Sequence, residues 1–421
     1  MQTETFLKFC LPIFVGLAVR SSVILHPHSG ENKGPLFGDY EAQRHWMEIT
    51  THLPLSQWYF NSSRNDLNYW GLDYPPLTAY HSWILGKLSE LFNPHWTALL
   101  SSHGHESYEH KVFMRYTVLF SDVLIFVPAL CYYFHHTAHH FSTEATVQPF
   151  YTCLLSLLYP GLILIDHGHF QYNCVSLGLL IVSVAFFLSE RDVLGSIMFC
   201  LALSYKQMEL YHSLPIFFYL LGRCLHQPLR VGISKFLCLG CTVLSTFSLV
   251  CAPFLINRDT FYQLIHRMFP IARGLYEDKV ANFWCASSPL FKWRLLFSQS
   301  DLIYLCTFLV FLSNIPTGLV LLVRPQRKKF LFALASSALS FFLFSYQVHE
   351  KSILLTAIPA LLLLPIDQNA SFLFSVYSTL SMWPLLYKDG LGLAMHELPS
   401  YHTGNTDVKS KAESGTKFLD D

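Results

Sequence analysis

The chain has 421 residues, of which 52% are hydrophobic and 13% are Asp, Glu, Lys or Arg, with a formal net charge of zero. A soluble domain carries about a quarter charged residues, so this composition excludes an ordinary soluble enzyme and indicates an integral membrane protein. A neutral chain also offers no basic surface for nucleic acid. The 11 cysteines lie mostly in apolar runs and form no CxxC pair, so neither a disulfide framework nor a zinc site is expected.

Apolar runs follow one another along the chain, and a run of about 20 residues is enough to cross a bilayer. Residues 236–257 and 302–323 contain no charged residue and are the clearest spans. Shorter runs bring the total to about eleven in an all-α polytopic membrane protein: residues 6–24, 113–134, 150–165, 174–188, 193–205, 211–221, 330–346, 353–366 and 370–387. The first run has no cleavage signal, so we expect a retained anchor rather than a removed signal peptide.

Placing the N-terminus in the cytosol and alternating the spans sorts the connecting segments into two kinds. The basic clusters, residues 222–235 and 324–329, fall on the cytosolic side, as the positive-inside bias requires. The polar, motif-like segments fall on the other side, beginning with a long first loop over residues 27–112 that contains a glycosylation sequon at Asn61. We therefore expect one membrane domain over residues 1–390 with its polar face in the lumen of the secretory pathway, followed by a polar, disordered tail over residues 391–421.

The first loop opens with LFGDYEAQRHW, which concentrates charge in an otherwise apolar chain. After Asp39, apolar residues recur at spacings of four, three and four, which predicts an amphipathic helix lying in the membrane interface. Asp39 would stand at or near the N-cap of this helix, either as a cap alone or as a functional carboxylate. Its neighbours Glu41, Arg44 and His45 are expected to solvate the helix.

A second cluster, YWGLDYPPLTAYH, places Asp73 among aromatic side chains that include Trp70 and Tyr74. Aromatic rings stack on the C–H face of a sugar while a nearby carboxylate accepts its hydroxyls, so the pattern is typical of a sugar-binding site. An interfacial aromatic belt with a turn is the equally weighted alternative.

Two later stretches carry charge at the expected membrane face. RMFPIARGLYEDKVANFWC contains charged residues in an aromatic setting, among them Arg273, Glu277 and Asp278. YQVHEKS places three polar residues at the mouth of a span, namely His349, Glu350 and Lys351. Such a triplet suits a phosphate at headgroup depth, with Lys as the charge and His as a donor. An ordinary charge cluster at a helix end is the alternative.

The segment DHGHFQYN contains Asp166, His167 and His169. Its H-x-H spacing suits a strand better than a helix and comes with no third ligand at a defined spacing, so substrate contacts are favoured over a metal. Asp122 lies inside a predicted span, where we expect it to pair with Arg20 or a polar neighbour in a structural role.

Taken together, these motifs resemble the dolichyl-phosphate-glucose-dependent glucosyltransferases of the endoplasmic reticulum. The resemblance runs from about residue 6 to about residue 390 and is carried by FGDYEAQRHW, WYFNSS, YWGLDYPPLTAYHS, YPGLILIDHGHFQYN, KQMELYH, FPIARGLYEDKVANFWC and FSYQVHEKSILL. It is closest to the member that adds the first glucose to the lipid-linked high-mannose oligosaccharide, and the sibling that adds the second glucose is the alternative. Two alternatives outside this enzyme class are an inactive form and a lipid-linked glycan transporter. The sequence shows no internal repeat of the kind that transporters tend to have.

The resemblance implies a GT-C fold, a multi-span helical bundle in the endoplasmic reticulum membrane with a lumenal active site. The donor would be dolichyl-phosphate glucose and the acceptor the dolichyl-pyrophosphate-linked oligosaccharide, joined in an α-1,3 bond with inversion. Such a transfer needs one general base, and the resemblance assigns this role to Asp39. The sequence has no D-x-D motif and no credible G-x-G-x-x-G after a strand, so no metal or other cofactor is expected. No obligate protein partner is evident from the sequence.

The resemblance further implies a set of substrate-binding residues: Trp70, Asp73, Tyr74, His169, Gln171, Lys206, Arg273, Glu277, Asp278, His349, Glu350 and Lys351. Among these, His349 and Lys351 would meet the donor phosphate, and Lys206 would line the cavity. Relatives continue past SMWPLLYKDG with further spans where this chain has a polar tail. A shortened form with reduced activity is therefore also considered.

Overall fold

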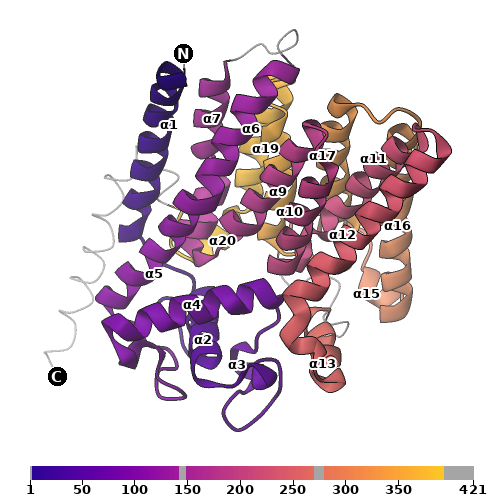
Figure 1. Ribbon diagram of the computed structural model, residues 1–421. Helices are drawn as coiled ribbons and strands as arrows, with labels where there is room; N and C mark the ends of the chain where they lie inside the picture. The colour runs from indigo at the N-terminus through magenta and orange to yellow at the C-terminus, as the bar shows by residue number, and fades with distance from the viewer. Residues whose placement is uncertain (1, 142–147, 270–278, 393–421) are drawn as a thin grey trace, which may run out of the picture.

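The computed structural model describes residues 2–141, 148–269 and 279–392 (Figure 1). These residues form helices and no β-strand, with one isolated β-bridge between Ser62 and Asn65, which confirms the all-α prediction for this part of the chain. The α-helices are α1 Gln2–Ser22, α2 Gly38–His52, α3 Leu67–Trp70, α4 Pro76–Phe92, α5 Tyr108–Ser121, α6 Val127–His140, α7 Pro149–Leu157, α8 Pro160–Ile163, α9 Asn173–Leu188, α10 Asp192–Tyr205, α11 Ser213–Leu225, α12 Leu229–Leu255, α13 Arg258–Met268, α14 Phe283–Ser287, α15 Trp293–Leu296, α16 Gln299–Val323, α17 Arg327–Phe344, α18 Leu354–Leu362, α19 Gln368–Ser381 and α20 Trp383–Lys388. The π-helical stretches are η4 Asp122–Phe126 and η5 Leu164–Phe170, and the 3₁₀ stretches are η1 Val23–Leu25, η2 Leu55–Gln57, η3 Pro94–Thr97, η6 Gln207–His212 and η7 Glu350–Ile353.

Within the described ranges, four helices are long and apolar enough to cross a membrane: Tyr108–His136, Pro149–Phe170, α12 and α16. α16 contains the uncharged run 302–323, and α12 contains all but the last two residues of the uncharged run 236–257. The other predicted spans are also helical, but several, such as α9 and α10, are too short to qualify by length. The structure thus supports a membrane protein, while the count of about eleven spans stays a prediction.

The outer helices turn large apolar side chains away from the bundle. Leu249 of α12 is 78% exposed and Phe308 of α16 is 60% exposed, and α16 stands at the edge of the bundle in Figure 1. An apolar surface of this kind is stable against acyl chains rather than against water, and helical backbone leaves no polar group unsatisfied there. These helices therefore have the surface of lipid-facing spans.

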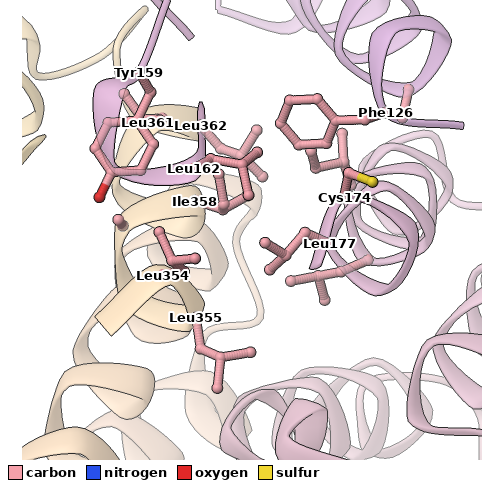
Figure 2. Packing of buried hydrophobic residues seen from close by; sticks show 14 of the residues in the cluster. Phe126, Tyr159, Leu162, Cys174, Leu177, Leu354, Leu355, Ile358, Leu361 and Leu362 are labelled. Atoms are coloured by element: carbon pink, nitrogen blue, oxygen red, sulfur yellow. The ribbon is translucent and has the colours of Figure 1, made fainter. Parts of the chain in front are cut away.

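Inside the bundle, side chains from distant segments meet in one apolar core. Figure 2 shows Leu354 and Ile358 of α18 opposite Phe126 of η4 and Leu177 of α9, and each of the four is at most 1% exposed. Because lipid tails are as apolar as leucine, close packing rather than water exclusion stabilises this part of the molecule.

A buried charged cluster ties α1 to the middle of the bundle. Arg20 Nε donates to Asp122 Oδ2 at 2.9 Å, and His167 Nε2 lies 2.5 Å from the same oxygen. Arg20 Nη1 also donates to the Leu157 carbonyl oxygen at 2.6 Å. All three side chains are about 1% exposed, so the predicted structural pairing of Asp122 with Arg20 is confirmed.

The first loop folds into a cap of helices, α2, α3 and α4, at one end of the bundle, beside α13 (Figure 1). The helix predicted after Asp39 is confirmed as α2, but its character was predicted wrongly. Glu41, Arg44 and His45 are each at most 1% exposed and do not solvate it. Arg44 donates to the carbonyl oxygen of Trp96 and to Ser102 Oγ, because the chain around η3 covers the polar face of the helix.

Candidate active site

An open cavity lies between the first-loop cap and the end of the bundle. Its volume is about 1870 Å³, part of which is solvent at its mouth. It brings the predicted base Asp39 together with most of the residues predicted to bind substrate, which lie far apart in the sequence: Trp70, Asp73, Tyr74, His169, Gln171, His349, Glu350 and Lys351. Lys206 lines an adjoining pocket of about 550 Å³ together with Asp73 and Tyr74. The remaining predicted residues, Arg273, Glu277 and Asp278, lie outside the described residues.

The local backbone at the start of α2 directs Asp39 into this cavity. The N-cap is Phe37, with a left-handed φ of 56°, and no side chain caps the helix. Asp39 therefore lies near the N-cap, as predicted, but the alternative that it serves only as a cap is wrong. Gly38 follows Phe37 with φ +67°, and a Cβ there would lie 2.5 Å from Ser29 Oγ. Only glycine fits this close approach in a left-handed conformation. Ser29 Oγ in turn accepts the Asp39 backbone N–H at 3.2 Å.

Three side chains converge on a single oxygen of the Asp39 carboxylate. Gln171 Nε2 donates to Oδ2 at 2.5 Å, and His169 Nε2 lies 3.0 Å from the same atom. The Lys351 ammonium also donates to it. The Asp39 side chain is 23% exposed. The carboxylate is thus held in one orientation while part of it faces the cavity.

The charges around Asp39 keep it ionised. Burial alone would raise the pKa of Asp39, but the charges of Lys351 and His169, and the hydrogen bonds from them, outweigh burial and hold the pKa well below its usual range. The carboxylate is therefore an acceptor at neutral pH, as a base must be.

A second layer of amides orients Gln171. Asn173 Nδ2 donates to Gln171 Oε1 at 3.0 Å and to Asp166 Oδ1 at 2.7 Å. This fixes which end of the Gln171 amide points at Asp39, because its oxygen is already in use. Asp166 is therefore a support for the site, and the two histidines of DHGHFQYN diverge: His167 turns to Asp122 and His169 to Asp39.

Lys206 extends the same polar network toward the aromatic wall. Its ammonium donates to Asn173 Oδ1 and, at 3.4 Å, to Gln171 Oε1, and it lies 5.4 Å from the centre of the Tyr74 ring. Burial and the neighbouring Lys351 charge lower the pKa of Lys206 to about 8. Lys206 therefore adds a group beside the cavity that is largely charged at neutral pH.

The aromatic wall is fixed by hydrogen bonds to backbone. Trp70 Nε1 donates to the Leu36 carbonyl oxygen at 2.6 Å, which holds α3 against the start of α2. Gln207 Nε2 donates to the Asp73 carbonyl oxygen at 2.9 Å. Arg267 of α13 donates through Nη2 to the Gly71 carbonyl oxygen at 3.0 Å. The wall is a rigid surface of rings and one carboxylate, which is the composition of a sugar-binding surface.

Comparison with known proteins identifies the family to which the chain is related. The sequence profile of the ALG6, ALG8 glycosyltransferase family matches residues 5–402. The dolichyl pyrophosphate Man9GlcNAc2 alpha-1,3-glucosyltransferase of Rattus norvegicus is 50% identical over 389 residues, which is 92% of this chain and 76% of that protein. The protein of the same name in Mus musculus is 51% identical over the same shares. A probable enzyme of that name in Drosophila melanogaster is 46% identical over 90% of this chain and 79% of its own length.

The chain belongs to the ALG6, ALG8 glycosyltransferase family. This confirms the family resemblance read from the sequence motifs.

The cavity of this family member also contains residues that the sequence did not single out for the site. Arg267, Lys33 and Asp389 all line it. Lys33 Nζ donates to the Lys388 carbonyl oxygen at 2.9 Å and joins the first loop to the end of α20. Lys33 and Asp389 stand in none of the polar motifs used to predict the site, and Arg267 opens the charged stretch RMFPIARGLYEDKVANFWC without an assigned role. Only the folded chain brings the three residues to the cavity.

Among the described residues of this glycosyltransferase, one group has ligating atoms close enough to share a metal ion: His45, Glu48 and His103. Both oxygens of Glu48 already accept hydrogen bonds, Oε2 from Arg44 at 2.7 Å and Oε1 from the Leu100 backbone N–H at 2.7 Å. A cation here would also face the Arg44 guanidinium. The group therefore fits a buried ion-pair network better than a metal centre.

Proposed function

We propose that the chain transfers glucose from dolichyl-phosphate glucose onto the dolichyl-pyrophosphate-linked high-mannose oligosaccharide that carries no glucose, forming an α-1,3 bond with inversion. The observation that carries this proposal is the oriented, ionised Asp39 carboxylate in the wall of a large polar and aromatic cavity. The names of the relatives from rat and mouse support the choice of acceptor and linkage.

In this reaction the acceptor hydroxyl oxygen attacks C1 of the glucose as the bond from C1 to the phosphate oxygen breaks. Dolichyl phosphate leaves with the electron pair of that bond, and the hydroxyl proton passes to Asp39. A phosphate is a stable leaving group, so a second carboxylic acid is not required, in contrast to the paired acids of glycosidases. Asp39 as the only base is therefore sufficient for a direct displacement.

Lys351 is proposed to interact with both the base and the donor phosphate in this displacement. Its ammonium contacts Asp39, and a donor phosphate entering the cavity would compete for the same charge. As Lys351 moves toward the phosphate, the pKa of Asp39 rises and the carboxylate becomes a stronger base. Donor binding and activation of the base are thereby coupled. His349 lines the same region of the cavity and is proposed to donate to the phosphate.

We also propose that the cavity lies at the lumenal face of the endoplasmic reticulum membrane in a multi-pass chain of the GT-C type. The support is the sidedness of charge: the basic connectors 222–235 and 324–329 alternate with the polar segments that meet at the cavity. A lumenal site has no access to cytosolic nucleotide sugars, which favours a polyprenyl-phosphate donor.

The pH dependence of the reaction tests the role of Lys351. Because Lys351 and His169 hold the pKa of Asp39 well below its usual range, the acid limb of kcat/KM should lie below the ordinary Asp value of about 4. In Lys351→Met this pKa rises, so the acid limb moves to higher pH and KM for the donor increases. The measurement is kcat/KM against pH. Lys351→Arg is the matched control, since it keeps the charge and should keep the limb low. A limb that stays in place in Lys351→Met would contradict the coupling.

The function itself is tested in microsomes that lack the endogenous enzyme and contain this chain. They receive dolichyl-phosphate glucose labelled in the sugar and a nine-mannose lipid-linked acceptor. We expect one labelled glucose on this acceptor and none on an acceptor that already bears a glucose. The reverse preference would assign the chain to the second glucose, and no product on either acceptor would refute the proposal. EDTA should leave the rate unchanged, because the sequence carries no D-x-D motif.

A further inference from the structure

A carboxylate, an imidazole and a second carboxylate form a continuous line through the site. His169 Nδ1 lies 2.5 Å from Asp389 Oδ2, and His169 Nε2 lies 3.0 Å from Asp39 Oδ2. The side chains of His169 and Asp389 are each 4% exposed. We propose that Asp389 is a positioning residue that acts through His169 to hold the base Asp39 in place. This inference rests on the proposed role of Asp39.

The end of α20 is built to deliver Asp389 to this point. The helix stops at Lys388, and Gly390 follows Asp389 with φ +76°, the left-handed conformation in which glycine commonly ends a helix. The Leu391 backbone N–H donates to the Leu386 carbonyl oxygen at 2.8 Å and closes the turn. The Leu391 side chain is fully buried against Gly168, where a Cβ would lie 2.7 Å from it. The turn is thus locked onto η5, next to His169.

The two contacts of His169 favour one protonation state of its ring. A neutral imidazole has one donor nitrogen and one acceptor nitrogen, whereas here a carboxylate oxygen faces each nitrogen. With both carboxylates ionised, both contacts are favourable only when His169 is an imidazolium that donates to Asp389 and to Asp39. Lys351 Nζ also faces this ring and lies 3.5 Å from His169 Nε2. Two anions and two cations therefore balance, and the charge of Asp389 is needed for that balance.

Asp389→Asn removes this charge but keeps the shape of the side chain. His169 then becomes neutral, accepts at Nδ1 from the Asn amide group and donates from Nε2 to Asp39. The hydrogen bond to Asp39 is no longer assisted by a positive charge on the ring, so the Asp39 carboxylate is held less firmly. We expect kcat to fall by about 10- to 100-fold, the range for loss of the carboxylate that orients a metal-bound histidine, because Asp389 orients His169 in the same way. The KM values for both substrates should change little, because the buried side chain of Asp389 acts on the base rather than on the sugar.

The experiment is a double-mutant cycle in the full chain with Asp389→Asn, His169→Ala and both together. If Asp389 acts through His169, adding Asp389→Asn to His169→Ala lowers kcat no further. A separate structural role of Asp389 would instead give multiplicative losses, which would overturn the proposal. Asp389→Glu, which restores a carboxylate, should recover part of the rate, and absence of any recovery would also count against it.

A matched control separates positioning from loss of a buried carboxylate in general. Asp192 is also nearly buried, at 5% exposed, and pairs with Lys235 at 2.5 Å and Arg223 at 3.2 Å at the opposite end of α10 from Lys206. Asp192→Asn should leave kcat per folded molecule unchanged. A loss of kcat equal to that of Asp389→Asn would overturn the proposal.

A readout without turnover keeps this inference distinct from the proposed function. In histidine-labelled protein, nitrogen NMR at neutral pH should show both His169 nitrogens protonated in the wild type and one in Asp389→Asn, with the His169→Ala spectrum giving the assignment. A neutral His169 in the wild type would overturn the proposal whether or not the chain transfers glucose. If the wild type transfers no glucose while His169 is doubly protonated and loses a proton in Asp389→Asn, the proposed function fails and the coupling of Asp389 to His169 stands.

Discussion

Asp39→Asn is expected to lower kcat by about 10²- to 10⁴-fold, the usual contribution of a positioned general base. The amide has nearly the same shape as the carboxylate and can still accept from Gln171, but it cannot take the proton of the acceptor hydroxyl. The Lys351 side chain is 18% exposed and can turn to the solvent of the cavity, so the fold should persist. The measurement is the initial rate at saturating donor and acceptor, together with thermal unfolding of the same preparation.

Asp73→Asn is the matched comparison for this substitution, because Asp73 lines the same cavity and is assigned to sugar binding rather than to proton transfer. It should raise KM more than it lowers kcat. If Asp39→Asn kept the wild-type kcat, or if Asp73→Asn alone abolished turnover at saturation, Asp39 would not be the base.

Arg44→Met is expected to destabilise the first-loop cap by about 3–5 kcal/mol, the cost of breaking a buried ion pair from one side. Arg44 is fully buried, and its Nη2 donates to Glu41 at 2.6 Å and to Glu48 at 2.7 Å. Methionine fills a similar volume but leaves two buried carboxylates without their shared cation. The measurement is the rate at which a protease cleaves the first loop in the otherwise intact membrane protein, compared with the wild type.

The triple variant Glu41→Gln, Arg44→Met, Glu48→Gln provides the control, since it removes the charges together with their partner. It should recover a large part of the lost stability. Protease resistance of Arg44→Met equal to that of the wild type would show that the cap does not depend on this network.

The same network predicts a dependence of cap stability on pH. Burial alone would raise the pKa of Glu48, but His45 and Arg44 outweigh it and lower the pKa to about 2. A carboxyl whose pKa is depressed by folding contributes stability above its unfolded pKa, and this contribution is lost as pH falls through the folded pKa. The cap should therefore keep the stabilisation from Glu48 at neutral pH and lose it between about pH 4 and pH 2.

The parts of the fold that depend on local pattern could be predicted from the sequence. The uncharged runs in α12 and α16 are visible as composition alone, and the spacing of apolar residues after Asp39 gives α2. Burial of the charges on α2 could not be predicted in this way, because it depends on the chain around η3, about 50 residues later, covering them. An amphipathic pattern reports one apolar face and does not report what covers the other.

In the candidate site, too, the sequence indicated individual residues but not the contacts between distant ones. The motifs marked Asp39, Asp73 and Lys351 as unusual for an apolar chain, but the contact of Lys351 with Asp39 joins residues 312 positions apart. Lys351 was assigned to the phosphate alone, since no sequence spacing relates it to Asp39. Asp389 lies 220 positions from its partner His169 and has no motif of its own. Pairings of this kind follow from the bundle packing and from no local rule.

The stereochemistry of the product tests the central claim most directly. Purified chain is supplied with dolichyl-phosphate glucose of β configuration and the nine-mannose acceptor, and the anomeric configuration of the new bond is read by NMR and by digestion with linkage-specific glucosidases. A direct displacement with Asp39 as base inverts the anomeric carbon, so the account predicts an α-1,3 bond. A β bond would mean two successive displacements through a covalent intermediate, and Asp39 would then not be a base in a single step.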